Sequence, residues 1–335
     1  MKEAKYWKVL ESDKNIVNCL LCPRKCVVAD GEYGKCNARK NIDGRLFSMV
    51  YGKVVSGISV DPIEKKPLYH FLPGTKSLSF GTAGCNLHCL HCQNWQISQT
   101  NPEESYNVNL APSEIVDKAI AEDCATIAFT YTEPTIFFEY MIDTAKIAKE
   151  KGVKCIIVSN GFINPEPLKE LMGLISGANI DFKGNDEFYK KYTGAWLGPI
   201  KETMVALKKK GIWLELTTLI IPTKNDSIDD IKKMVSWVKE NLGSDVPWHF
   251  SAYYPCYKMD APATSAELLK EIRQMVMGNG MKYVYAGNIM DEKTNSTFCS
   301  DCSVLVVDRI GFGVNLGQFR KGKCINGHNI DGVWK

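Results

Sequence analysis

The sequence has no apolar run long enough to cross a bilayer, and its first residues, Met1 to Lys5, do not form the apolar core of a signal region. It also has little excess charge of either sign, because 41 Lys and Arg residues against 38 Asp and Glu residues give a net charge of +3. So small an excess does not predict a large binding surface for nucleic acid or lipid headgroups. We therefore expect a cytoplasmic protein with neither a membrane nor a nucleic-acid partner.

The composition is otherwise that of a globular protein, with 45% hydrophobic and 24% charged residues. A length of 335 residues allows one large domain or two to three smaller ones. Cysteine is the exception, since the chain has 13 and structural disulfides are rare in a reducing cytosol. Ten of these cysteines fall into three groups, which indicates metal binding.

The central group comprises Cys85, Cys89 and Cys92, spaced C-x3-C-x2-C directly after the apolar run Ser77–Phe80. Iron–sulfur clusters are held by cysteine thiolates, and a four-iron cluster has four corners to fill. Three ligands would leave one iron open to a substrate, just as a catalytic zinc keeps one position free. Read alone, the spacing also allows a zinc site or unligated core thiols.

The first segment, residues 1–72, contains a second group of cysteines. Gly31 and Gly34 permit a tight return of the chain towards the last of them. Four thiolates suit either a closed tetrahedral zinc site or an auxiliary iron–sulfur cluster, and four unligated thiols are the alternative. The members of the group are Cys19, Cys22, Cys26 and Cys36.

Residues 73–290 alternate short apolar runs with amphipathic stretches, which predicts a parallel sheet with helical crossovers. Because the alternation recurs six or seven times, it predicts an α/β barrel or an open, partial barrel. After Ser77–Phe80, strands are expected at 125–129, 154–158, 178–182, 212–221, 247–252 and 282–286. Helices are expected at 112–121, 134–149, 166–175, 199–210, 228–242 and 264–277.

Polar residues occur on or just after these strands, and the carboxyl ends of barrel strands are where the chemistry of such folds lies. Each residue alone is compatible with a cap or a turn. Together they predict one functional mouth. They include Tyr131 to Pro134, Ser159 to Gly161, Asp181, Lys183, Glu215, Thr217, Thr218, His249, Gly287 and Asn288, besides the three-cysteine loop.

The last segment, residues 291–335, carries a third group of metal-ligand residues around an expected hairpin with Gly311 and Gly313 in its turn. The group is Cys299, Cys302, Cys324 and His328. The spacing C-x2-C…C-x3-H resembles a zinc ribbon, and so small a unit would need its metal in order to fold. Zinc is favoured because it suits mixed sulfur and imidazole ligation. The alternative is a metal-free tail docked on the barrel.

Several motifs, found in this order, carry a resemblance to a known family. Beside the three-cysteine loop they are Cys19 to Cys26, Thr130 to Pro134, Asp181 to Lys183, Trp248 to Pro255 and Tyr283 to Asn288. The chain resembles the radical S-adenosylmethionine (SAM) enzymes, and within them the protein of the AmmeMemoRadiSam system. That group is similar to the activating enzymes of pyruvate formate-lyase and other glycyl radical enzymes. The resemblance implies a TIM-like partial (β/α)6 barrel with the cluster at its mouth.

The resemblance also implies a [4Fe-4S] cluster on Cys85, Cys89 and Cys92, whose open iron binds SAM. One electron then cleaves SAM to a 5′-deoxyadenosyl radical, which abstracts a hydrogen atom. The implied SAM-binding residues are His91, Glu133, Ser159, Asn160, Asp181, Lys183 and His249. Glu133 matches the acidic residue that receives the SAM ammonium, and His91 stands where the family usually has an aromatic residue beside the adenine.

This chain departs from the family pattern at two places. Tyr131 and Thr132 replace the Gly-Gly that normally precedes Glu-Pro, so only the Glu133-Pro134 half carries over. A second C-x2-C expected near the C-terminus lacks its last cysteine, which leaves either a substitution by His328 or an incomplete site.

The implied partners are an electron donor such as ferredoxin or flavodoxin, together with AMMECR1-like and Memo-like proteins. Three functions stay open: a radical SAM enzyme acting on a substrate that could be a partner protein, a glycyl radical activating enzyme, and a non-catalytic iron–sulfur carrier or metal-binding scaffold. The polar residues at the strand ends favour an enzyme, because a carrier would not need them. Cys256, after the strand expected at 247–252, is expected near the mouth, as either a substrate-facing thiol or an ordinary packing residue.

Overall fold

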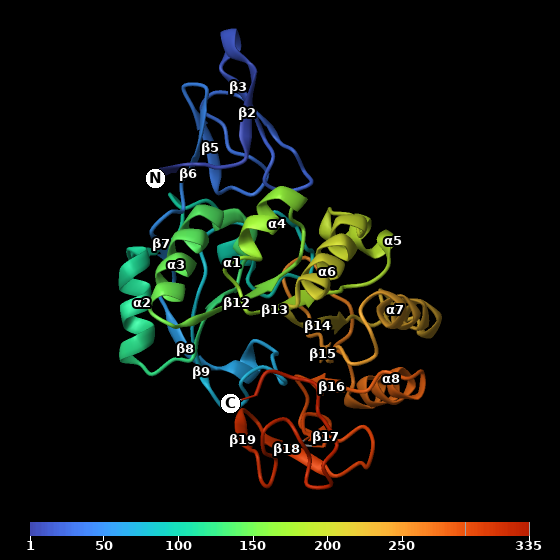
Figure 1. Ribbon diagram of the computed structural model, residues 1–335. Helices are drawn as coiled ribbons and strands as arrows, with labels where there is room; N and C mark the ends of the chain where they lie inside the picture. Colours follow the sequence, from blue (N-terminus) through green and yellow to red (C-terminus); the bar gives the residue numbers. More distant parts are fainter. Residues whose placement is uncertain (292, 335) are drawn as a thin grey trace.

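The structure, a computed structural model, describes residues 1–291 and 293–334. Its centre is an eight-stranded sheet in the order β16-β15-β14-β13-β12-β11-β9-β8 (Figure 1). Seven of these strands are parallel, and β8 runs antiparallel to β9 at one edge. The bounds are β8 (Ser59–Pro62), β9 (Lys76–Phe80), β11 (Thr126–Phe129), β12 (Lys154–Ser159), β13 (Gly177–Asp181), β14 (Trp213–Ile220), β15 (Trp248–Ala252) and β16 (Val284–Gly287).

Six major helices follow one another around the outside of this sheet (Figure 1). They are α2 (Pro112–Ala121), α3 (Phe138–Glu150), α4 (Pro165–Leu171), α6 (Gly198–Lys210), α7 (Ile228–Asn241) and α8 (Ala266–Gly278). Each buries one apolar stripe; in α7 the stripe includes Ile231, Val235 and Val238. The predicted α/β fold with a mostly parallel sheet is confirmed. In the described ranges, no helix combines the length and apolarity needed to cross a membrane.

Two helices differ from their predicted bounds for local reasons. The stretch expected as one helix at 134–149 starts as a 3₁₀ turn, η3 (Pro134–Phe137), and α3 begins at Phe138. The carboxylate of Glu133 accepts a hydrogen bond from the amide of Thr135 and so caps this turn. The helix expected at 166–175 ends at Leu171, and the chain turns through Gly173 before β13.

The N-terminal segment folds into two small antiparallel sheets, with strand orders β1-β6-β5 and β2-β3-β4. It lies beside α3 and α4 at one end of the barrel (Figure 1), where the amide of Lys5 donates to the Glu139 carboxylate over 2.7 Å. A separate pair is formed by β7 (Lys53–Val55) and β10 (Asn107–Asn109). The bounds are β1 (Lys2–Glu3), β2 (Trp7–Glu11), β3 (Ile16–Cys19), β4 (Val27–Val28), β5 (Arg39–Ile42) and β6 (Arg45–Ser48).

The C-terminal segment contains β17 (Thr297–Phe298), β18 (Leu305–Ile310) and β19 (Gly313–Asn315), with Gly311 in the turn between the last two. It packs between the two edges of the open barrel. Tyr69, from the loop before β9, and Tyr285 of β16 share one apolar cluster with Val307. The chain end also pairs with that loop, since the amide of Leu72 donates to Val333 O over 2.7 Å. The segment therefore covers the opening between β16 and the β8–β9 edge.

Candidate functional site

The three-cysteine loop follows β9 and passes unusually close to two neighbouring segments. A Cβ atom at Gly81 would lie 2.5 Å from Thr130 O, and one at Gly84 would lie 2.3 Å from Cys36 O. Gly84 also has a φ of +95°, a conformation that favours glycine. The two glycines therefore allow the loop to lie directly against the end of β11 and against the N-terminal cysteine segment.

Cys85, Cys89 and Cys92 line one open cavity at the carboxyl ends of the parallel strands. The wall of this cavity is mostly polar and comes from six successive strands, β9 to β15 in the sheet order, or the loops that follow them. The structure thus places polar side chains from successive strands around one cavity at the carboxyl ends of the sheet. The other lining residues are Leu87, His91, Gln93, Asn94, Ser98, Tyr131, Thr132, Asn160, Asp181, Lys183, Thr217, Leu219 and Ser251.

The thiols of this loop have hydrogen-bond donors beside them. Cys85 Sγ lies 3.4 Å from the amide of Leu87 and 3.9 Å from Asn160 Nδ2, while Cys92 Sγ lies 3.2 Å from Ser98 Oγ. Such donors stabilise thiolates, the form that binds iron. No fourth thiol lines the cavity in the part of the chain that the structure describes. Three thiols around a shared space fit three corners of a four-iron cluster.

Without metal two of these thiols, Cys85 and Cys89, hold their protons strongly. Burial raises the pKa of Cys85 well above its usual value. Burial also raises the pKa of Cys89 to about 12, although the positive charge of Lys183 acts in the opposite direction. Metal binding at this loop would therefore release protons.

Asp181 and Lys183 form an ion pair on the wall of the cavity, with Lys183 Nζ 2.7 Å from Asp181 Oδ2. Burial alone would lower the pKa of Lys183, but the charge and hydrogen bond of Asp181, together with Cys89 and Tyr189, outweigh burial and raise this pKa. Tyr189 fixes the local backbone, since its hydroxyl donates to Asp181 O and accepts from the amide of Lys183, each over 2.9 Å. One cation and one anion are thus held side by side, an arrangement complementary to an amino-acid group that carries both charges.

Glu133 lies beneath the cavity and does not line it. Its carboxylate is fully buried and accepts from Thr135, through its amide at 2.9 Å and its Oγ1 at 2.7 Å. It also accepts from Ser159 Oγ and from the amide of Asn160, each over 2.8 Å. Burial raises the pKa of Glu133, and these hydrogen bonds oppose the rise. Glu133 therefore joins the loops after β11 and β12, and through them it positions Asn160 at the cavity.

The two histidines predicted to contact SAM have different surroundings. His91 lines the cavity beside Phe188, and its Nδ1 has no hydrogen-bond partner among the described residues. Burial lowers the pKa of His91 to about 3, so the ring is neutral at pH 7. His249 lies inside the barrel, stacked on Tyr285 and 2.7 Å from Glu215 Oε2, and it does not line the cavity.

The seven residues predicted to bind SAM therefore divide into two sets. Four line the cavity: His91, Asn160, Asp181 and Lys183. The other three, Glu133, Ser159 and His249, are buried behind its wall. Sequence reasoning missed Ser98 and Ser251 as lining residues. Ser251 had a usable signal, because it stands two residues after His249 near the carboxyl end of β15, whereas nothing in the sequence marked Ser98.

Cys256 lies beside the three-cysteine loop, where its thiol donates to Cys92 O over 3.5 Å. It is not among the residues that line the cavity. This contact anchors the loop from the side of β15.

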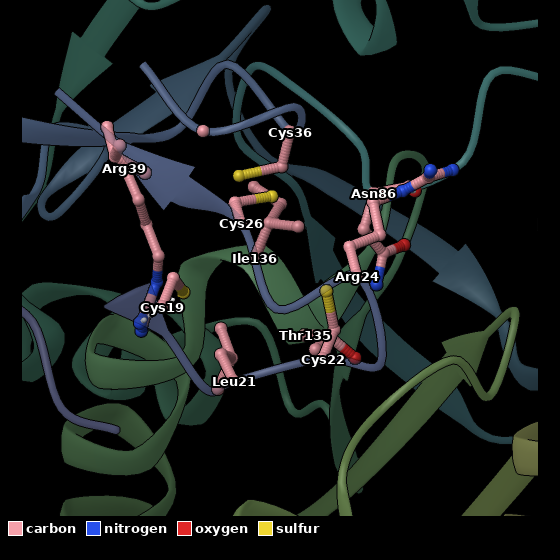
Figure 2. Close-up of a pocket in the computed structure, with 12 residues that line it drawn as sticks. Cys19, Leu21, Cys22, Arg24, Cys26, Cys36, Arg39, Asn86, Thr135 and Ile136 are labelled. Atoms are coloured by element: carbon pink, nitrogen blue, oxygen red, sulfur yellow. Dashed lines mark hydrogen bonds between the residues drawn. The ribbon is translucent and has the colours of Figure 1, made fainter. Parts of the chain in front are cut away.

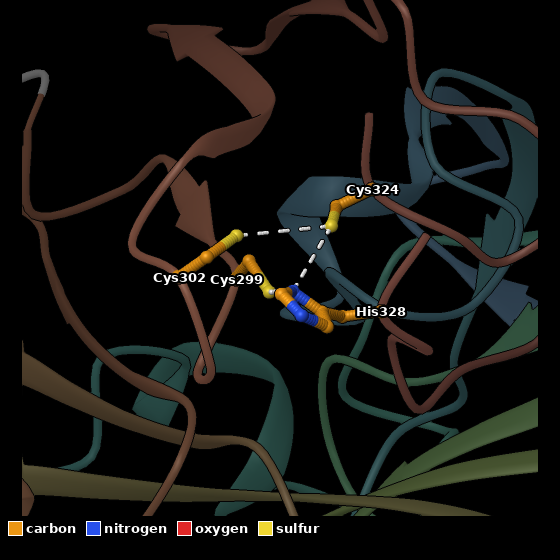
Figure 3. A group of neighbouring side chains, drawn as sticks. All are labelled: Cys299, Cys302, Cys324 and His328. Carbon is orange, nitrogen blue, oxygen red and sulfur yellow. Dashed lines mark hydrogen bonds between the residues drawn. The ribbon is translucent and has the colours of Figure 1, made fainter. Parts of the chain in front are cut away.

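The C-terminal group forms a compact ligand set (Figure 3). His328 Nδ1 lies 3.6 Å from both Cys299 Sγ and Cys324 Sγ, and the sulfurs of Cys302 and Cys324 are 3.8 Å apart. Four ligands about 2.0–2.3 Å from one tetrahedral ion stand roughly 3.5–3.8 Å from each other. These residues could therefore hold one metal ion, and His328 occupies the corner where the family pattern has a cysteine.

The four N-terminal cysteines also come together, but in another way. Their side chains surround a small cavity between the N-terminal segment and the barrel (Figure 2). Unlike the C-terminal group, they do not include three sulfur atoms that all lie within 4.8 Å of one another, as judged over the described residues.

Comparison with known proteins agrees with this geometry. The family model of the radical SAM superfamily matches residues 80–238, the stretch from the end of β9 into α7. An uncharacterised protein of Methanocaldococcus jannaschii is 44% identical over 335 residues, covering 99% of each chain. The pyruvate formate-lyase-activating enzyme of Clostridium pasteurianum is 26% identical over 176 residues, 50% of this chain and 71% of that enzyme.

Among solved structures, a radical SAM methyltransferase from Sphaerobacter thermophilus has a TM-score of 0.52 with 15% identity, covering 65% of this chain and 67% of that one. This likeness concerns the fold alone. With the family match, the mostly parallel α/β sheet and the three-cysteine loop in place, the chain contains a radical SAM domain over residues 80–238. The family implies a four-iron cluster and SAM as cofactors. The match confirms the predicted radical SAM family, and the narrower AmmeMemoRadiSam group stays a prediction.

Proposed function

We propose that the chain is a radical SAM enzyme that cleaves SAM reductively and uses the product radical to abstract hydrogen from a further substrate. A bound cluster would supply one electron to SAM, and the resulting 5′-deoxyadenosyl radical would take the hydrogen atom. One observation carries the proposal: the three thiols of the loop and the Asp181–Lys183 pair face the same cavity. That combination offers both a cluster site and a recognition site for an amino-acid group.

The residues of the cavity wall take separate roles in this proposal. Cys85, Cys89 and Cys92 hold the cluster at three corners. Lys183 pairs with the SAM carboxylate and Asp181 with its ammonium, both through charge-assisted hydrogen bonds.

Of the remaining predicted SAM residues, one contacts the adenine and three support the residues that line the cavity. His91, which lines the cavity, offers a flat ring to the adenine. Glu133 and Ser159 hold Asn160 in place, and His249 supports the barrel interior, so these three act as positioning residues.

A second candidate is the activation of a glycyl radical enzyme, and the 26% identity to the Clostridium pasteurianum activating enzyme favours it. In that case the substrate would be a protein backbone. Membership of the AmmeMemoRadiSam system, with AMMECR1-like and Memo-like partners in the cytoplasm, is a further proposal that rests on the motifs. Ferredoxin or flavodoxin is the proposed source of the electron.

Anaerobic reconstitution separates these enzymes from a non-catalytic iron–sulfur carrier. We expect the reduced protein to show a four-iron electron paramagnetic resonance (EPR) signal that changes on addition of SAM, and to form 5′-deoxyadenosine. The triple variant Cys85→Ala/Cys89→Ala/Cys92→Ala should lose both, while Cys155→Ala, a buried core variant, should keep both. A wild-type cluster that neither responds to SAM nor cleaves it would identify a carrier instead.

For the C-terminal group we propose zinc, because three thiolates and one imidazole at tetrahedral spacing suit this ion. Metal analysis of protein purified without added zinc tests the choice.

A further inference from the structure

The N-terminal cysteines surround a space instead of meeting at one point. Cys19, Cys22, Cys26 and Cys36 line the cavity together with apolar side chains that include Leu21 and Ile136 (Figure 2). Thiolates that share one zinc ion stand about 3.8 Å apart, a spacing that the described N-terminal sulfurs do not reach as a group. A four-iron cluster has a separate iron for each thiolate, so its ligands stand further apart. The cavity therefore fits a group larger than one ion.

Arg39 gives this cavity a positively charged wall. Its side chain is 1% exposed, its guanidinium pairs with Glu139, and Nη1 lies 3.8 Å from Cys19 Sγ. Its Nε is buried and has no hydrogen-bond partner among the described residues. A buried N–H without an acceptor is costly. A four-thiolate iron–sulfur cluster is an anion whose sulfur atoms accept such hydrogen bonds, and these bonds tune its reduction potential.

This cavity is in direct contact with the three-cysteine loop. The amide of Cys85 donates to Cys36 O over 3.1 Å, and Gly84 leaves the room for this contact. The next residue, Asn86, lines the N-terminal cavity, and its Oδ1 accepts from Asn160 Nδ2 over 2.9 Å. Asn160 in turn lines the central cavity. Consecutive residues of one loop therefore face the two cysteine sites.

The other side of the N-terminal cysteine loop opens to the surface. Cys26 also lines an open groove together with Arg24, Lys25 and Lys35, against which Glu32 is the one carboxylate among the described lining residues. The excess of cations suits an acidic partner.

We propose that Cys19, Cys22, Cys26 and Cys36 hold a second four-iron cluster, which relays electrons from an acidic, low-potential donor protein at this groove to the central cluster. In each transfer the donor loses one electron, the second cluster gains and then loses it, and the central cluster gains it; no bond forms or breaks. A path through one hydrogen bond runs from the carbonyl of Cys36 to the amide of Cys85. The relay rests on the proposed function, whereas binding of the second cluster does not.

Iron analysis tests the second cluster without any activity assay. After anaerobic reconstitution, the wild type should contain about eight irons per chain, and the Cys85→Ala/Cys89→Ala/Cys92→Ala variant about four. Mössbauer spectra of that variant should show a four-iron cluster that does not respond to SAM. Zinc with no iron in the same variant would overturn the proposal, as would a variant that is folded and metal-free.

Reduction kinetics test the relay, with freeze-quench EPR following the central cluster in the absence of SAM. Lys25→Glu/Lys35→Glu should slow reduction by flavodoxin at least tenfold, leave reduction by dithionite unchanged and keep all iron. Cys22→Ser/Cys26→Ser should contain about four fewer irons, and flavodoxin should reduce its central cluster at least tenfold more slowly. Cys155→Ala should keep both the iron content and the rate of the wild type. Unchanged flavodoxin rates in both test variants would refute the relay. Rapid reduction without SAM cleavage would instead refute the proposed function and leave the relay standing.

Discussion

His249 Nε2 lies 2.7 Å from Glu215 Oε2 inside the barrel, where neither side chain reaches the cavity. The same carboxylate accepts from the amides of Tyr69 at 3.0 Å and His70 at 2.8 Å, and from Trp213 Nε1 at 3.0 Å. Burial alone would raise the pKa of Glu215, but the histidines and the hydrogen bonds outweigh it and lower this pKa. Glu215 is thus an ionised hub that ties the loop before β9 to β14 and β15.

Replacing Glu215 by glutamine should destabilise the fold. A glutamine would present an NH₂ group where four donors need acceptors, and leaving a buried donor unpaired costs about 1–3 kcal/mol. Urea unfolding of Glu215→Gln should show this loss, while Glu202→Gln on the exposed side of α6 should not change the free energy of unfolding. An unfolding free energy equal to that of the wild type would show that the hub is dispensable.

His70 should make stability depend on pH. Its ring is buried, with Nε2 2.5 Å from Tyr285 OH and Nδ1 2.6 Å from Asp331 O, and burial lowers its pKa from 6.5 to about 4. Between pH 4 and pH 6.5 the His70 ring binds a proton in the unfolded chain but not in the folded one. The contribution of His70 to the free energy of unfolding is therefore complete above about pH 6.5 and is lost as the pH falls towards 4. At pH 5 the loss should be about 2 kcal/mol.

The change in unfolding free energy between pH 7 and pH 5, compared between the wild type and a His70 variant, isolates the effect of this histidine. His70→Gln should be less stable than the wild type at pH 7, yet its unfolding free energy should fall by about 2 kcal/mol less on going to pH 5. Loss of metal in acid affects both proteins equally and cancels in the comparison. Parallel pH profiles for the two proteins would contradict the assignment.

The alternation of strands and helices could be predicted because the apolar residues of each element face the same core. The α7 stripe and the single apolar run of β11 are examples in which local pattern and burial agree. The mouth could also be predicted, since carboxyl ends of parallel strands meet at one edge. Asp181 and Lys183 are at that edge as expected.

What the sequence could not supply was the direction of each side chain and the contacts between distant segments. Glu133 follows a strand, as a cavity residue would, but its side chain is buried and its carboxylate accepts hydrogen bonds from Thr135, Ser159 and the amide of Asn160. The Arg39–Glu139 pair and the Cys36–Cys85 hydrogen bond join segments far apart in the chain. Periodicity carries no information about such pairs, because they arise only when the segments pack.

Removal of the imidazole ligand should empty the C-terminal metal site. His328→Ala leaves three thiols and one open corner, so we expect the zinc content of purified protein to fall from about one ion per chain to a small fraction. Because so small a hairpin depends on its metal, limited proteolysis should then cut around β18 and β19. Lys321→Ala, an exposed change in the same segment, is the control. Full zinc content in His328→Ala would show that the three cysteines alone bind the ion.

Lys183→Met should weaken SAM binding. The ammonium of Lys183 is the cation that faces the cavity beside Asp181, so its removal deletes a charge-assisted contact to the SAM carboxylate and leaves a carboxylate to repel it. A hydrogen bond to a charged group contributes about 1.5–3 kcal/mol, which corresponds to roughly ten- to hundredfold in affinity.

Titration calorimetry on reconstituted protein measures this change in SAM affinity. Lys183→Arg should recover part of the affinity, and Lys190→Met, an exposed change in the short π-helix Tyr189–Thr193, should bind SAM like the wild type. Equal affinity for the wild type and Lys183→Met, at equal iron content, would remove the ion pair from the recognition site.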